Sequence, residues 1–253
     1  MSLKHLIMMT KINLIKIGDS MTQYSFSKVD CFNQCPLKYK LRYIDKVQVE
    51  QDVSEDNALI LGTTMHTGIE EGWEPAMRYY FSQFPCPTQA REWEVMKLIH
   101  YIPTLHEIFK GGAFETHVQR DNFHGYIDCI KDNCLWDFKY ANAKNASKYE
   151  TSPQIHLYAW ATGAKLDSIG YYLIPKISIR QRKDETPELF RNRLVDTLNE
   201  SRPIEIVVDY NEDYVEQFKC DVERLETCKD FIPVVTKLCD WCEYKDMCPE
   251  RKD

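Results

Sequence analysis

The sequence predicts an α/β domain in which helices flank a mixed central sheet. Three observations support this fold class. The apolar residues keep a helical period as far as residue 111, change to a period of two over 113–140, and then alternate between helical and extended patterns. With 253 residues, 43% of them hydrophobic, the chain can bury one substantial core. We therefore expect a single domain over 24–253.

That domain divides into three parts by pattern. A helical part covers 24–111, a sheet-bearing core covers 112–210, and a C-terminal helix with a cysteine cluster covers 211–253. Residues 1–23 precede the strongest N-terminal signal, so we predict that they form a dispensable leader.

The helical part begins with two short helices. From Ser25 onward the apolar residues share one helical face, and Pro36 predicts a break between the two helices. A polar, acidic loop over 50–57 follows. Helical spacing then runs over 59–81, which predicts one longer helix.

The switch from helix to sheet is marked by glycine. A helix is expected over 88–109, kinked at Pro103, and the glycines at 111–112 end it. The period of two over 113–140 then predicts three adjacent strands, the last two joined as a hairpin at 131–133.

The rest of the chain alternates between the two patterns, which favours a mixed sheet. The expected elements are a helix over 153–163, a strand over 169–179, a helix over 187–199, a strand over 204–208 and a helix over 212–228.

Charge and hydropathy exclude some protein classes. The net charge of −7 argues against a surface that is basic throughout, although a site that gathers carboxylates around divalent cations is compatible with DNA. The longest apolar stretch, over 3–17, is interrupted by charged residues, so it is neither a membrane span nor a good secretory signal. We expect a cytoplasmic protein without membrane contact. Its ten cysteines then suggest metal ligation or burial before disulfides.

Two acids and a lysine lie on the predicted hairpin. Asp128 ends one strand motif, Gly-Tyr-Ile-Asp, and Asp137 begins Asp-Phe-Lys on the next strand. Because side chains alternate along a strand, Asp137 and Lys139 share a face while Phe138 points into the opposite core. Acids can hold Mg²⁺ or Mn²⁺, and phosphodiester hydrolysis needs such a cation. An isolated Asp-x-Lys is most often an ordinary exposed pair, so its weight depends on neighbouring motifs.

Two further motifs accompany the acids in a fixed order. Gly-x-x-x-His ends at His66 upstream, and Gln-x-x-x-Tyr joins Gln154 to Tyr158 downstream. Mn²⁺ accepts imidazole, which gives His66 a role as a ligand. Taken alone, His66 is more often a core or surface histidine, and the downstream pair can equally cap and pack its helix.

This order of motifs resembles the RecB-like nucleases of the PD-(D/E)xK superfamily, which include the AddB nuclease domain, CRISPR-associated RecB-like exonucleases and phage exonucleases. The N-terminal part of the pattern is found in Ser25-Phe26-Ser27 and in Cys35-Pro36. The resemblance implies a restriction-endonuclease-like core. It also implies that the chain is a metal-dependent DNA exonuclease acting in recombination, repair or related DNA processing.

The resemblance assigns roles to the site residues. It implies that His66, Asp128, Asp137 and the backbone carbonyl of Phe138 bind Mg²⁺ or Mn²⁺, and that Lys139 orients the attacking water and balances charge. Gln154 and Tyr158 would position DNA or Lys139. Glu115, on the preceding strand, would assist directly or through water.

The C-terminal cysteines predict a second metal site. Cys239, Cys242 and Cys248 supply three thiolates within ten residues, and a fourth must come from elsewhere. Four thiolates suit either zinc or a [4Fe-4S] cluster. The resemblance implies the cluster, with Cys35 as the fourth ligand and Cys31 as the rival, and the cluster would then staple the terminal regions together.

Partners and rival functions follow from the same motifs. DNA would be held largely through phosphates, by basic residues that include Lys38, Lys40, Arg42, Lys46, Lys144 and Lys148. Because no Gly-x-x-x-x-Gly-Lys-[Ser/Thr] motif is present, a helicase or recombination protein would be a separate chain. The alternatives are a catalytically inactive DNA-binding or scaffold subunit with the same fold, and a zinc-binding nucleic-acid module.

Overall fold

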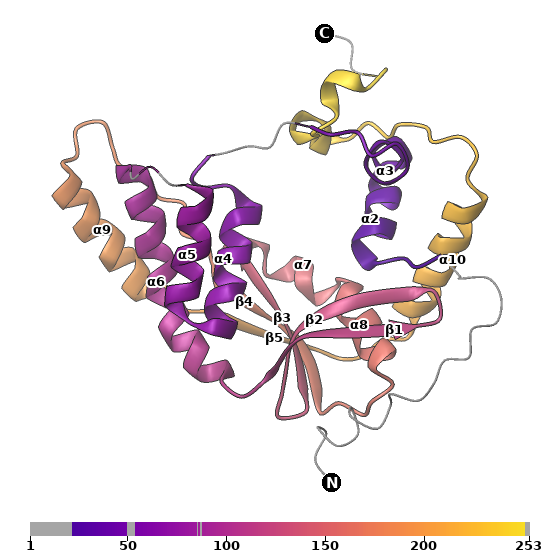
Figure 1. Ribbon diagram of the computed structural model, residues 1–253, viewed down its shortest axis with the longest axis horizontal. Coiled ribbons are helices and arrows are strands. Elements are labelled where there is room, and N and C mark those ends of the chain that lie inside the picture. The colour runs from indigo at the N-terminus through magenta and orange to yellow at the C-terminus, as the bar shows by residue number, and fades with distance from the viewer. Residues whose placement is uncertain (1–21, 50–53, 85, 87, 251–253) are drawn as a thin grey trace.

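A mixed sheet forms the centre of the computed structural model, which describes residues 22–49, 54–84, 86 and 88–250 (Figure 1). Over these residues its five strands lie in the order β1-β2-β3-β4-β5. The strands are β1 (Ala113–Arg120), β2 (Phe123–Lys131), β3 (Cys134–Ala141), β4 (Ser168–Pro175) and β5 (Ile204–Val208). The β3–β4 pair is parallel and the other three pairs are antiparallel, so the predicted mixed sheet is confirmed.

Helices cover both faces of this sheet (Figure 1). One group consists of α4 (Ala58–Glu71), α5 (Trp73–Gln83), α6 (Gln89–Phe109) and α9 (Pro187–Glu200). The other consists of α2 (Phe26–Gln34), α8 (Gln154–Thr162) and α10 (Asp213–Thr227). No helix among the described residues is long and apolar enough to cross a membrane.

Short helical segments complete the described chain. They are α3 (Pro36–Tyr39), the π-helix η1 (Lys40–Ile44), the 3₁₀ helix η2 (Ala143–Asn145), α7 (Ser147–Glu150), and the 3₁₀ helices η3 (Lys237–Trp241) and η4 (Lys245–Met247). The predicted leader lies outside the described residues, apart from its last two positions.

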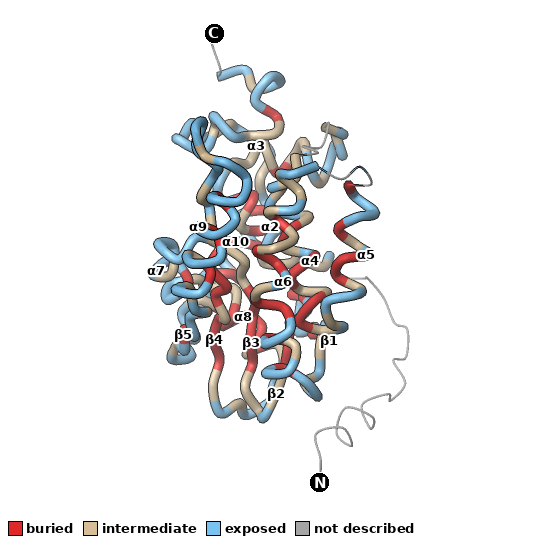
Figure 2. The backbone as a smooth tube through the Cα atoms, turned by 90° about the vertical axis from the view of Figure 1, so that its left-hand side faces the viewer, coloured by how far each residue is buried: buried red, intermediate tan, exposed pale blue. Residues whose placement is uncertain are grey.

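Two hydrophobic cores lie on opposite faces of the sheet, and Figure 2 shows buried backbone along the strands and the helices that face them. The first core contains Phe123, Ile127 and Tyr171 from the strands together with residues of α2, α8 and α10. The second contains Phe138 and Ile174 together with residues of α4, α5, α6 and α9. Strand β3 therefore sends Phe138 into the second core, as the alternation of side chains predicts.

Most predicted helices form, and residues at their expected ends cap them. Thr88 caps the start of α6, and Gly163, in a left-handed conformation, ends α8. The expected single helix over 59–81 is wrong, because Gly72, at φ 98°, ends α4 and α5 starts immediately after it. Pro103 does not interrupt α6, which is one helix through that residue.

Candidate metal centre

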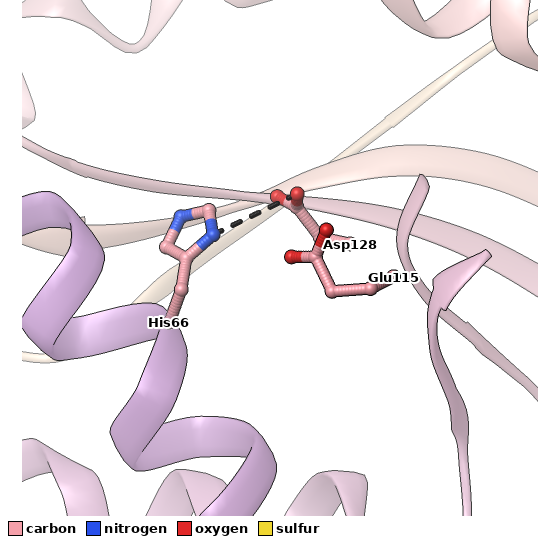
Figure 3. Close-up of side chains that lie close together, drawn as sticks. All are labelled: His66, Glu115 and Asp128. Atoms are coloured by element: carbon pink, nitrogen blue, oxygen red, sulfur yellow. Dashed lines mark ion pairs between the residues drawn. The ribbon is translucent and has the colours of Figure 1, made fainter. Parts of the chain in front are cut away.

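Three side chains from three elements meet beside the sheet. His66 comes from α4, Glu115 from β1 and Asp128 from β2, and one ligand atom from each lies within 4.8 Å of the other two. Figure 3 shows the two carboxylates directed toward each other and the imidazole ring approaching them from its helix. Two carboxylates and an imidazole are a donor set that suits Mn²⁺ and also provides oxygen ligands for Mg²⁺.

Strands β2 and β3 separate beside this centre and form one side of it. Their ladder pairs Cys129 with Trp136 and stops there, although continuing the same register would pair Asp128 with Asp137. Instead, Asp128 Oδ2 accepts a hydrogen bond of 2.6 Å from the backbone N–H of Phe138. Because the two strands separate at this point, the Phe138 carbonyl is available to the site, and it lies 3.1 Å from His66 Nε2.

Strained backbone places Glu115 opposite Asp128. The β1–β2 ladder pairs Phe114 with Cys129 and Thr116 with Ile127, so the intervening Glu115 faces Asp128 across the ladder. Glu115 has a φ of 44°, in the left-handed region that costs an ordinary residue of order 1–3 kcal/mol. Two like charges directly opposite each other on a sheet also destabilise the pair. A bound cation would relieve that repulsion.

Close helix packing fixes the position of His66. Two residues after it, Gly68 lies so near Ile102 of α6 that an added Cβ would be 2.6 Å from the isoleucine Cδ1 atom. The imidazole Nδ1 is 3.7 Å from Asp128 Oδ1. Burial lowers the pKa of His66 despite the neighbouring carboxylate of Asp137. The ring is therefore neutral near pH 7, which is the form that binds metals.

Asp137 lies beside the three-residue cluster rather than within it. Its side chain is buried, and Oδ2 lies 2.7 Å from the ammonium of Lys139 without forming a well-directed hydrogen bond. Burial alone would lower the pKa of Lys139, but Asp137 and Asp128 together raise it. The lysine is therefore a fixed positive charge at neutral pH.

Gln154 and Tyr158 of helix α8 hold Lys139 in place on the face of the sheet that α8 covers. The Lys139 ammonium donates to Gln154 Oε1 over 3.1 Å, and Gln154 Nε2 donates to the hydroxyl of Tyr158 over 2.9 Å. The Tyr158 ring fits because Gly125 has no side chain, since a Cβ there would be 2.5 Å from Tyr158 Cε1. The structure therefore brings the predicted Gln-x-x-x-Tyr motif to the predicted lysine.

The electrostatics of the centre suit a divalent cation. Burial, and after it the carboxylate of Asp137, raises the pKa of Asp128 well above its ordinary value. The carboxylates of Glu115, Asp128 and Asp137 lie close to one lysine, Lys139, and to the neutral ring of His66. The buried Asp137 Oδ2 without a well-formed hydrogen bond is a further acceptor for a cation.

The four predicted cluster cysteines line one cavity of about 340 Å³. Cys35 lies between α2 and α3, and Cys239, Cys242 and Cys248 lie on and beside η3 and η4. Within the described residues, no three of these sulfurs approach within the 4.8 Å that defines the His66 group. The rival Cys31 is instead buried in the first core, and burial raises the pKa of its thiol.

Polar contacts hold the C-terminal segment against the N-terminal helices. Glu243 forms ion pairs with both Lys38 and Arg42, and the hydroxyl of Tyr244 donates to the Val47 carbonyl. Two of the basic residues predicted to contact DNA are therefore ion-paired with the single carboxylate of Glu243. A third, Lys40, is paired with Asp45.

Comparison with known proteins identifies the family. The family model of the PD-(D/E)XK nuclease superfamily matches residues 23–249. A solved structure described as "Crystal structure of SSO0001" aligns over 99% of this chain and 92% of that chain, with 12% identity and a TM-score of 0.42. No curated protein matches. Because the family match covers most of its length, the chain belongs to the PD-(D/E)XK nuclease superfamily.

Proposed function

We propose that this protein is a metal-dependent DNA exonuclease with its active centre at the opening between β2 and β3. The observation that carries the proposal is the convergence of His66, Glu115 and Asp128 beside the Phe138 carbonyl, next to a fixed lysine. The superfamily acts on nucleic acid. DNA as the substrate, digestion from an end, and a role in recombination or repair beside a separate helicase are extensions that rest on the motif resemblance.

In the proposed centre, His66, Glu115, Asp128 and the Phe138 carbonyl would hold Mg²⁺ or Mn²⁺, and the buried carboxylate of Asp137 would contribute. When bound, such an ion acts as a Lewis acid on the scissile phosphate and lowers the pKa of water. The His66 ring fits this role because burial keeps it neutral. Glu115 and Asp128 supply negative charge that the ion would compensate.

Lys139 acts as a donor in this scheme rather than as a base. Its pKa is raised by Asp137 and Asp128, so it has no free lone pair at neutral pH. The ammonium is held between Asp137 and Gln154, which aims its remaining proton toward a water or a phosphoryl oxygen. Tyr158 fixes Gln154 and so acts as a positioning residue.

For the second site we propose a [4Fe-4S] cluster held by Cys35, Cys239, Cys242 and Cys248. Four cysteines lining one cavity support it. Four thiolates suit either zinc or a [4Fe-4S] cluster, and the motif resemblance favours the cluster. The cluster would be structural and would join the terminal segments.

The test is cleavage of end-labelled linear DNA by anaerobically purified protein in Mn²⁺ or Mg²⁺, beside Asp137→Ala. We expect metal-dependent cleavage by the wild type and loss in the variant. Circular single-stranded DNA, which has no end, should resist digestion if the enzyme is an exonuclease. Cleavage of circles would refute the exonuclease mode alone. No cleavage of any DNA would refute the nuclease proposal and favour an inactive binding or scaffold subunit.

A further inference from the structure

Three aromatic and imidazole side chains form an exposed strip on the β1–β2 ribbon. Tyr126 is 53% exposed, His117 is exposed, and His124 is half-buried. Their rings are neighbours, with centroids 4.9 Å apart for His117 and Tyr126 and 6.3 Å apart for His117 and His124. We call these three residues the ribbon strip.

The ribbon strip lies on the face of β1 and β2 that points away from the first core. Val118, Phe123 and Ile127 are all buried in that core. Because successive side chains of a strand point to opposite faces, the neighbours of these three residues, His117, His124 and Tyr126, point outward. A large tyrosine side chain that is half exposed on an edge ribbon adds nothing to the core, so burial does not explain its presence.

The ribbon strip continues directly from the proposed metal centre. Asp128 is two residues after Tyr126 along β2, and Glu115 is two residues before His117 along β1. His117 and Tyr126 face each other in the ladder, and the Thr116–Ile127 pair separates them from Glu115 and Asp128. Two strand residues span about 6.6 Å, so a phosphate at the carboxylates and a ring on Tyr126 would lie within one extended nucleotide of each other.

The chemistry of the ribbon strip matches a nucleobase. Every base has a π-face, and bases stack on exposed aromatic side chains without sequence preference. A base inside a duplex has both faces covered by its neighbours, so only an unpaired base can stack here. Burial, and after it the ammonium of Lys28, lowers the pKa of His124, so this ring is neutral near pH 7.

We propose that the ribbon strip is a stacking subsite for an unpaired base flanking the scissile phosphate, with Tyr126 as its main contact. The subsite deepens the proposed nuclease function and rests on it for the position of the phosphate. In this proposal the nucleic-acid strand binds along the outer face of the β1–β2 ribbon.

The test measures binding without cleavage. A fluorescein-labelled oligothymidylate of about twelve nucleotides is titrated with protein in Ca²⁺ in place of Mn²⁺, and its anisotropy is followed for wild type, Tyr126→Ala, Tyr126→Phe and Tyr210→Ala. Tyr210 is the matched control, because it is 46% exposed and follows β5 at the opposite edge of the sheet. The same titrations are repeated with an abasic strand of equal length.

We expect Tyr126→Ala to bind oligothymidylate about tenfold more weakly, while Tyr126→Phe and Tyr210→Ala bind as the wild type does. The wild type should prefer oligothymidylate over the abasic strand, and Tyr126→Ala should lose that preference. Equal binding by Tyr126→Ala and wild type would overturn the subsite even if the enzyme cleaves DNA. Base-dependent binding lost in Tyr126→Ala would support it even if no cleavage occurs, in which case only the nuclease proposal fails.

Discussion

At the scale of single residues, the centre combines crowded carboxylates with strained backbone. Asp128 is largely buried near Asp137 and opposite Glu115, whose backbone is in the left-handed region. Strain and like-charge repulsion at one point are typical of functional sites, where the surrounding fold maintains an arrangement that is costly by itself. No local sequence signal predicts that a glutamate will adopt this conformation. The sequence could therefore suggest a role for Glu115 but not its position.

Asp128→Asn should stabilise the metal-free protein at neutral and alkaline pH. Burial and Asp137 raise the pKa of Asp128, so the folded state holds this proton more tightly than the unfolded chain, whose aspartate titrates at about 4. The contribution of Asp128 to stability is then lost as pH rises from about 4 through the folded pKa. Asparagine keeps an acceptor for the Phe138 N–H and carries no charge.

Thermal melts in metal-free buffer at about pH 5 and about pH 8 check this prediction. The Tm of the variant should exceed that of the wild type at the higher pH, by roughly 2–4 °C for each kcal/mol recovered, and by less at the lower pH. His66, whose pKa is lowered, gives the opposite slope at acidic pH and lies 3.7 Å from Asp128, so the comparison is decided at the higher pH, where its ring is neutral in both proteins. A variant that melts lower at pH 8 would contradict the electrostatic account.

At the scale of elements, the site depends on where strands separate and on how closely one helix packs. Hydrophobic periodicity predicted the three strands over 113–140 and most helices, because burial dictates where apolar residues recur. Periodicity does not report where a ladder ends, and the separation of β2 and β3 at Asp128 follows from a side chain replacing a backbone partner. The break at Gly72 had a readable signal, since Pro75 lies in the first turn of the next helix, where proline is tolerated.

Gly68→Ala should displace α4 from α6 and weaken metal binding. An added Cβ would meet three side-chain atoms of Ile102 at 2.6–2.9 Å, and overpacking of this kind destabilises by roughly 1–3 kcal/mol. His66 is on the same helix two residues earlier, so its ring should move relative to Asp128. Urea denaturation and Mn²⁺ titration measure the two effects.

Gly62→Ala is the matched control on the same helix. No atom lies within 4 Å of a Cβ at this position, so alanine should raise helix stability by about 0.5–1 kcal/mol and leave Mn²⁺ affinity unchanged. If both variants behaved alike, close packing at Gly68 would not be what positions His66.

At the scale of the whole molecule, the C-terminal segment closes the chain onto its N-terminal helices. Figure 1 shows this segment beside α3, far in sequence but adjacent in space, and Glu243 and Tyr244 contact the stretch from Lys38 to Val47. The three clustered cysteines were evident from spacing alone. Their distant fourth partner was suggested only by resemblance, because no local pattern links Cys35 to them.

Cys35→Ser should lose the proposed cluster and loosen both termini. Closing a loop of this length stabilises a chain by about 5 kcal/mol in the entropy model, so Tm should fall by roughly 10–20 °C. Iron analysis and visible absorbance measure cluster content, with the exposed Cys220→Ser as the control. Iron content unchanged by Cys35→Ser, and lost in Cys31→Ser, would assign the fourth ligand to Cys31 instead.

The central claim is that His66, Glu115 and Asp128 form a divalent metal site. Isothermal titration of Mn²⁺ into the metal-free wild type, His66→Ala and Asp128→Asn tests it most directly. We expect one Mn²⁺ site in the wild type and at least about tenfold weaker binding in each variant, in line with the loss of a ligand. Wild-type affinity in both variants, or no binding to the wild type, would contradict the assignment of this centre.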